Sequence, residues 1–192
     1  MRRRYLLLLL SLLSPWAMAD WHVEPDYSRI SFVSVKRGDI AEVQRFTNIT
    51  GMIDGQGAVR VVMPFADLDS GLALRDERMR DLLFRSERFP QAELVGQVDL
   101  AQWEQLPVGE SEIGTVDFEL DLHGHQQRLK ADVMVSRLAE KRIQVATLEP
   151  VVLKAELFDM QDGLKRLREV ANLPAIASEV PVSAILDFQQ RP

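Results

Sequence analysis

Two histidines, His123 and His125, lie two residues apart around Gly124. In a β-strand this spacing places both imidazoles on one face, as in some metal sites. A metal site needs three or four ligands, however, and no third ligand is close in sequence. The segment is also typical of a hairpin turn. We therefore expect a solvated turn without a metal, and no cofactor.

Catalytic patterns are missing from the sequence. The third histidine, His22, follows Trp21 and has no evident nucleophile partner. The chain has no G-x-S-x-G, no H-E-x-x-H and no glycine-rich phosphate loop. Its acidic residues alternate with apolar ones along strands, although two of them could still meet at a barrel mouth. The sequence predicts that the protein is not an enzyme, and no residue is assigned a catalytic role.

Lys36 is a candidate for contacting a charged headgroup. If the alternation of Ile30 and Phe32 continues through Ser34, Lys36 points inward near the end of its strand. An inward lysine must reach a partner or an opening. The alternative is that a bulge near Gly38 turns Lys36 to solvent.

The most charged stretch of the chain supplies two further headgroup candidates, Arg75 and Arg78. A guanidinium at a barrel mouth could hold a phosphate or carboxylate by two parallel hydrogen bonds. The alternative is an exposed helix with i,i+4 ion pairs such as Asp76–Arg80 and Asp81–Arg85, which stabilise little.

The first 19 residues predict a signal peptide. Arg2 to Arg4 are followed by a leucine-rich core, and Ala17-Met18-Ala19 forms a small-x-small cleavage site. The apolar run is shorter than the roughly 20 residues that span a bilayer. We expect cleavage before Asp20, no transmembrane segment in the mature chain, and a periplasmic location.

Charge and cysteine content limit the partners of the mature chain. Removal of three arginines changes the formal charge from −6 to −9, which argues against binding nucleic acid. The absence of cysteine excludes disulfides, a thiol nucleophile and thiolate metal ligands. Residues 20–192 are long enough for one domain with a substantial core.

Alternation with period two runs through most of this domain and predicts strands with one buried face. About eight such segments are present, joined mostly by short connections, which favours an antiparallel sheet closed into an eight-stranded barrel. The segments lie around residues 30–32, 59–63, 92–100, 116–122, 129–135, 143–147, 151–157 and 182–188. Such a barrel is wide enough to hold one small ligand.

Two stretches have helical spacing instead. Residues 76–84 place Met79, Leu82 and Leu83 on one face, and residues 163–173 form a second short amphipathic helix. Asp162 is expected to cap the start of the second helix, and Pro174 follows its end. The predicted fold is therefore mainly β, an antiparallel eight-stranded barrel with one or two short helices.

Several motifs, in order, resemble those of the YceI-like family. The mature start resembles the family's opening pattern, with Glu24 for the usual Asp and Tyr27 for the usual His. The other matching positions are Trp21, Pro25, Ser28, Ile30, Phe32, Phe46, Gly51, Ser70, Arg75 to Arg80, Leu83-Phe84, Phe89-Pro90, Leu120, Leu122, Gly124, Phe158 and Val180-Pro181-Val182. The histidine at the Tyr27 position is absent, and the helical stretch 163–173 replaces the family's usual C-terminal segment.

The resemblance implies a lipocalin-like barrel with an elongated apolar cavity that binds polyisoprenoids or fatty ligands. The expected function is a periplasmic carrier of an isoprenoid or other long-chain lipid, with a homodimer as a further option. The alternative is a non-catalytic envelope interaction module whose barrel is filled by its own side chains. Eight residues are expected to line the cavity: Ile30, Phe32, Phe65, Leu94, Phe118, Leu120, Leu153 and Leu186.

Overall fold

The alternating segments pair into one antiparallel sheet that curls around an apolar interior. The computed structural model describes residues 20–191, so the expected signal peptide lies outside the described residues. Its strands are β1 (Asp20–Val23), β2 (Arg29–Lys36), β3 (Ile40–Phe46), β4 (Thr50–Ile53), β5 (Ala58–Pro64), β6 (Leu68–Asp69), β7 (Gln91–Gln97), β8 (Ser111–Leu122), β9 (His125–Ala139), β10 (Arg142–Thr147), β11 (Val151–Lys154) and β12 (Glu179–Arg191).

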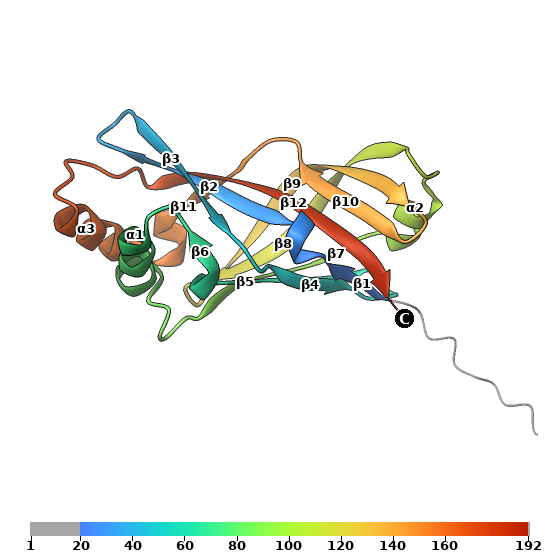
Figure 1. The fold of residues 1–192 in the computed structure, drawn as a ribbon, viewed down its shortest axis with the longest axis horizontal. Coiled ribbons are helices and arrows are strands. Elements are labelled where there is room, and N and C mark those ends of the chain that lie inside the picture. The colour runs from blue at the N-terminus through green and yellow to red at the C-terminus, as the bar shows by residue number, and fades with distance from the viewer. Residues whose placement is uncertain (1–19, 192) are drawn as a thin grey trace, which may run out of the picture.

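Eight of these strands close the barrel (Figure 1). The hydrogen-bonded order is β1-β4-β5-β7-β8-β9-β10-β12, and β12 pairs back onto β1. The predicted eight-stranded antiparallel, lipocalin-like barrel is thereby confirmed. Beyond this ring, β2 continues along β12 after β1, and β11 continues along the other side of β12 after β10.

The identity of the strands differs from the prediction in several places. Residues 143–147 and 151–157 were expected as separate strands, but β10 and β11 succeed one another along the same partner and make one interrupted barrel strand. Residues 155–158 form the 3₁₀ helix η4 (Ala155–Phe158) instead of continuing β11. The strands β1, β3, β4 and β6 were not predicted, and β3 and β4 together supply the missing barrel strand.

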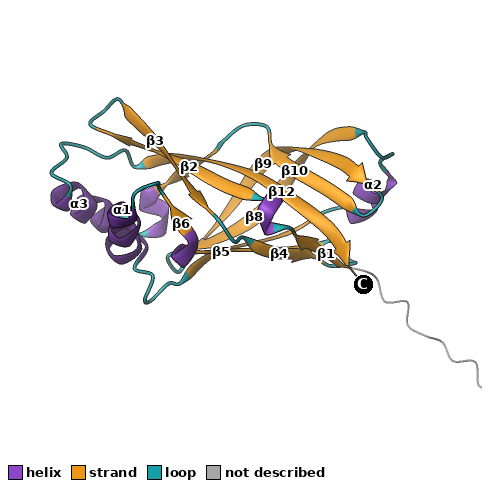
Figure 2. Ribbon diagram, in the orientation of Figure 1, coloured by secondary structure: helices purple, strands orange, loops and turns teal. Residues whose placement is uncertain are grey.

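The α-helices lie at the two ends of the barrel (Figure 2). At one end, which we call the helical end, are α1 (Ala73–Arg78), the π-helical turn η3 (Met79–Phe84), η4 and α3 (Gln161–Val170). The helix α2 (Leu100–Gln105) lies at the opposite end, near β1. Within residues 20–191, each helix falls short of the length and hydropathy needed to cross a bilayer.

The helix boundaries correct the sequence predictions. The helix expected at 76–84 begins at Ala73, and the helix expected at 163–173 spans Gln161–Val170. Asp162 lies inside the first turn of α3, and the N-cap position is occupied by Met160. The helix α2 was not predicted. The Asp99 carboxylate accepts the backbone N–H of Gln102 at 3.0 Å, which caps α2 and ends the preceding extended segment.

The predicted turn at His123-Gly124 is confirmed. Both residues have positive φ, 58° and 78°, and they join β8 to β9 as a two-residue hairpin turn. This turn lies against η4, because His123 contacts Phe158.

Stacked aromatic rings pack the interior toward the helical end. Phe65, in the 3₁₀ helix η2 (Phe65–Asp67), stacks on Phe84 with ring centroids 4.3 Å apart. Phe32 stacks on Phe46 at 5.6 Å. All four rings are buried, so the cover at this end is held by the same apolar contacts that form the core.

Candidate functional site

The barrel encloses a cavity of about 230 Å³. Its walls are the inward-facing positions of the strands, and residues of the helices and their connections line its two ends. All eight residues that the sequence predicted for a cavity wall do line it: Ile30, Phe32, Phe65, Leu94, Phe118, Leu120, Leu153 and Leu186. Their contact with a ligand stays a prediction.

The chemistry of the wall is almost wholly apolar. Among the described residues that line the cavity, two have a polar side-chain group: Thr147, with its hydroxyl, and Trp103, with its indole N–H. Thr147 Oγ1 accepts the backbone N–H of Ala184 at 3.1 Å, so the hydroxyl is already engaged where β10 leaves β12. The interior can therefore bury hydrocarbon, at about 25 cal/mol per Å² of apolar surface. It cannot solvate a charged group.

Residues of the helices and their connections, which the sequence analysis did not assign to the cavity, line its ends. At the helical end these are Phe84, Phe158, Met160 and Leu164, and at the opposite end Trp103 of α2. Phe158 is 1% exposed. The amphipathic pattern of α3 was the available signal for Leu164, whereas η4 and α2 were not predicted as helices at all.

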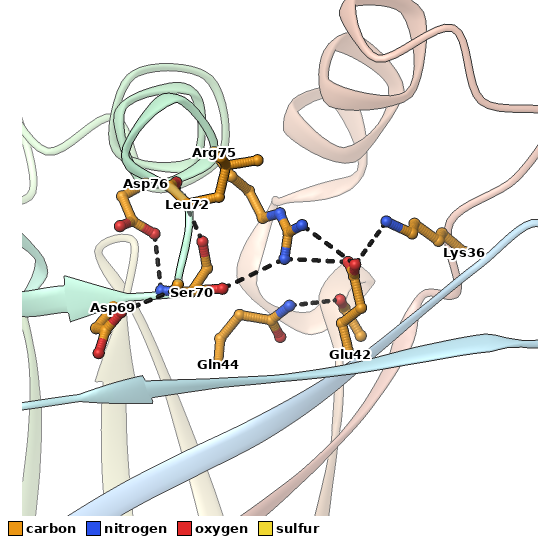
Figure 3. A network of polar contacts seen from close by, with 10 residues as sticks. Lys36, Glu42, Gln44, Asp69, Ser70, Leu72, Arg75 and Asp76 are labelled. Carbon is orange, nitrogen blue, oxygen red and sulfur yellow. Dashed lines mark hydrogen bonds and ion pairs between the residues drawn. The ribbon is translucent and has the colours of Figure 1, made fainter.

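A polar cluster lies beyond the cavity at the helical end (Figure 3). The face of β2 and β3 that carries Phe32 and Phe46 continues, two and four residues further on, into Lys36, Glu42 and Gln44. Lys36 Nζ donates to Glu42 Oε1 at 2.7 Å. Lys36 therefore shares the inward face with Phe32, as predicted, and the alternative of a bulge that turns it to solvent is wrong.

Arg75 reaches the same carboxylate from α1. Its two terminal nitrogens, Nη1 and Nη2, each lie 3.1 Å from an oxygen of Glu42. The hydrogen bond from Lys36, assisted by the charge of Arg75, holds the pKa of Glu42 below its usual value. Lys36, Glu42 and Arg75 are each about a quarter exposed. Within this trio one carboxylate faces two cations, and the wider network adds the carboxylates of Asp69 and Asp76, which accept from the backbone of the loop before α1.

The third predicted headgroup residue, Arg78, is not part of this cluster. Within residues 20–191 its side chain forms no hydrogen bond or ion pair, and it is partly exposed on α1. The expected pairs Asp76–Arg80 and Asp81–Arg85 do not form in the described structure either. Asp76 instead accepts the backbone N–H of Ser70 at 2.8 Å, which fixes the loop before α1.

Buried Gln44 is the member of the polar cluster that lies nearest the cavity along β3. It lies opposite Phe32 on the inward face and is 1% exposed. Its side-chain amide contacts Ser34 Oγ at 3.0 Å. None of Lys36, Glu42 and Arg75 lines the cavity itself. The arrangement is an apolar chamber with a charged rim, which includes Lys36 and Arg75, a few residues along the same strands.

The histidine turn is only partly solvated, which corrects the prediction. His125 is exposed, but His123 is 4% exposed and lies against Phe89, with ring centroids 4.5 Å apart. Its Nδ1 lies 3.1 Å from the carbonyl oxygen of Phe158. Burial lowers the pKa of His123. The fold also brings Asp159 beside the two histidines, so a third group is close in space although not in sequence.

A closed antiparallel barrel with an apolar internal chamber defines a lipocalin-like class of protein. Within that class, the chain belongs to the YceI-like family, because the model of the YceI-like domain matches residues 21–188. The resemblance inferred from the sequence is therefore confirmed. A comparison with curated protein sequences finds no significant match.

Solved structures agree with this assignment. A polyisoprenoid-binding domain from Saccharophagus degradans, implicated in plant cell wall breakdown, is 32% identical over 91% of this chain and 99% of that domain, with a TM-score of 0.87. Burkholderia cenocepacia BcnA is 18% identical, covering 86% and 98% of the two chains, with a TM-score of 0.66. A Campylobacter jejuni YceI protein is 13% identical, covering 78% and 84%, with a TM-score of 0.55.

Proposed function

We propose that this protein is a non-catalytic carrier that holds an isoprenoid or other long-chain lipid in its barrel. The observation that carries the proposal is the chamber of about 230 Å³, whose lining side chains are apolar except for the indole N–H of Trp103 and the hydroxyl of Thr147, which is engaged by the backbone of Ala184. Burying a polar metabolite in such a chamber would cost free energy, whereas burying a hydrocarbon chain is favourable. The similar domain from Saccharophagus degradans is described as polyisoprenoid-binding, which supports this choice of ligand.

Binding of a long lipid chain requires the chamber to expand. Pockets for drug-sized ligands span about 300–1,000 Å³, so a long chain needs more room than about 230 Å³. The flexible side chains of Met160 and Leu164 at the helical end can supply it by changing rotamer. The open volume also argues against the alternative of a barrel filled by its own side chains.

We place the headgroup of the ligand at the helical end. The charged rim formed by Lys36 and Arg75 suits a phosphate or carboxylate, and a chain entering there would run past Phe32 into the chamber. Arg78 is left out of this assignment because its side chain does not join the rim.

We also propose that the chain is exported and that its mature form begins at Asp20. The signal-like pattern of residues 1–19 supports this, and the family match begins at residue 21. Fractionation of cells that produce the full chain, with N-terminal sequencing of the product, tests it. Material with an intact N-terminus in the cytoplasmic fraction would contradict export.

The central experiment asks what the barrel holds. Protein purified without detergent is examined by native mass spectrometry and by solvent extraction, and the emptied protein is then mixed with geranylgeraniol. We expect co-purifying lipid and uptake of the alcohol, with a change in the fluorescence of Trp103, which lines the chamber. An empty protein that takes up no isoprenoid would overturn the proposal.

A pair of matched variants tests the location. Ala184 lines the chamber, whereas Ala146 lies between two lining residues of β10 and faces outward. Ala184→Leu fills part of the chamber and should reduce lipid uptake severalfold. Ala146→Leu adds the same volume outside and should leave uptake unchanged. Equal uptake by both variants would place the lipid elsewhere.

A further inference from the structure

Three side chains that can ligate a metal converge where the β8–β9 turn meets the η4–α3 connection. His123 and His125 come from the turn, and Asp159 follows η4. One ligand atom from each residue lies within 4.8 Å of the other two. The exposed side chains of His125 and Asp159 are free to adjust, whereas His123 is fixed by burial.

The orientation of the His123 ring provides a second, independent observation. A carbonyl oxygen can only accept, so the contact between Nδ1 and the Phe158 carbonyl, at 3.1 Å, places the ring proton on Nδ1. The lone pair then lies on Nε2, which is buried and has no hydrogen-bond partner. A buried polar atom without a partner requires an explanation. Metal-bound histidines have this arrangement, with the second ring nitrogen donating to a backbone carbonyl.

We propose that His123, His125 and Asp159 form a binding site for a divalent transition metal such as Zn²⁺. Imidazole and carboxylate ligands suit Zn²⁺, whereas Ca²⁺ and Mg²⁺ prefer oxygen ligands alone. Zinc completes its coordination with a fourth group, and water supplies it where a protein offers three ligands.

The site would connect the barrel to its cover. Asp159 lies between Phe158 and Met160, both of which line the chamber, and the two histidines belong to the turn between barrel strands. A metal held by all three residues ties η4 to the β8–β9 turn. Metal binding would therefore stabilise the closed helical end, and this inference does not depend on which ligand the chamber takes.

The test uses residues 20–192 prepared without a histidine tag and freed of metal by a chelator. Titration with ZnCl₂, followed by calorimetry, should give one zinc ion per chain and a higher melting temperature. The variants His125→Ala and Asp159→Asn change exposed positions, so both should fold, which circular dichroism checks. Each should weaken zinc binding by at least about tenfold, because even outer-shell changes cost that much.

His22→Ala is the matched control. His22 belongs to β1, at the end of the barrel opposite the turn, so this variant should bind zinc like the unmodified chain. In ¹⁵N spectra of the control, zinc should shift the Nε2 resonance of His123. Zinc affinity only in the millimolar range would overturn the site, as would equal affinity in His125→Ala, Asp159→Asn and the unmodified protein.

Discussion

The ammonium group of Lys36 donates to the Glu42 carboxylate at 2.7 Å across the β2–β3 pair. Both side chains lie on the face of these strands that lines the chamber further along. Arg75 approaches the same carboxylate from α1, at 3.1 Å. Glu42 therefore has two roles: it joins α1 to the barrel, and it occupies the cations that we assign to a headgroup.

The first prediction concerns the pH dependence of stability. The pKa of Glu42 is lowered in the folded chain by Lys36 and Arg75. The ionised Glu42 carboxylate therefore contributes fully to the free energy of unfolding at any pH well above the pKa of glutamate in the unfolded chain, which is about 4.3. The contribution disappears as the pH falls through the lower folded pKa. Glu42→Gln should reduce the free energy of unfolding at pH 7 by less than about 1 kcal/mol, because the pair is partly exposed.

Urea titrations of both proteins between pH 7 and pH 3 measure this difference, which should vanish at the acid end. Glu110→Gln is a suitable control, because Glu110 is exposed and forms no ion pair within residues 20–191. A difference between Glu42→Gln and the unmodified protein that persists at the lowest pH would show that the carboxylate charge is not responsible.

The second prediction concerns ligand charge. Glu42→Gln removes the carboxylate that competes for Lys36 and Arg75, so geranylgeranyl diphosphate should bind more tightly, by up to about tenfold, or about 1.4 kcal/mol. Replacing Lys36 and Arg75 with methionine should weaken binding of the diphosphate. Geranylgeraniol, which is neutral, should bind all three proteins alike. Parallel fluorescence titrations with the two ligands distinguish these cases, and identical behaviour of both ligands would place the headgroup elsewhere.

The third prediction concerns Asp187 of β12, a buried acidic residue that does not line the chamber. Asp187 is fully buried, and its two carboxylate oxygens accept from Arg142 Nε at 2.9 and 3.1 Å. Tyr27, at the position where the family usually has histidine, covers Arg142 with its ring 4.5 Å away. Asp187→Ala removes the buried carboxylate and its hydrogen bonds, and it leaves a guanidinium that is a third exposed and can be hydrated, so it should cost about 1–2 kcal/mol of unfolding free energy.

Chemical denaturation measures this cost, and the Asp117–Lys130 pair provides the comparison. Those two side chains are 71% and 72% exposed, with 3.1 Å between their charged atoms. Asp117→Ala should therefore change the unfolding free energy by less than about 0.5 kcal/mol. Equal effects of the two substitutions would contradict the importance that we give to burial.

The cavity wall could be predicted because alternation directly encodes which face of a strand is buried. Leu94, Phe118 and Leu120 needed no knowledge of the fold beyond a closed sheet. The strand β3 was missed because its alternation is inverted: Glu42 and Gln44 face inward, while Val43 is 66% exposed. A strand that turns polar residues inward does not carry the usual signal.

The remaining differences arise from contacts between distant segments. Asp159 is 36 residues from His123 and has no local pattern that marks it as a ligand, so only the packing of η4 on the β8–β9 turn brings the two together. Likewise, β10 and β11 are two separate segments in the sequence because Pro150 and its neighbours interrupt the strand. Only the tertiary structure shows that both pair with the same side of β12.

The last prediction tests how α3 is held over the chamber. Gly163 lies in α3, and a Cβ there would be 2.7 Å from the carbonyl oxygen of Leu82 and 2.9 Å from Cα of Leu83. In an exposed helix, replacing glycine with alanine stabilises by about 1 kcal/mol. Here the backbone of η3 must move, so Gly163→Ala should instead destabilise, by about 1–3 kcal/mol.

Because α3 carries Leu164, which lines the chamber, Gly163→Ala should also release bound isoprenoid faster. Thermal unfolding and a dilution assay with a fluorescent isoprenoid measure the two effects. Gly114→Ala, in β8, is the control, because its Cβ would meet nothing within 4 Å. If Gly163→Ala unfolds at a higher temperature and retains lipid as well as Gly114→Ala, the close contact between α3 and η3 does not hold the cover in place.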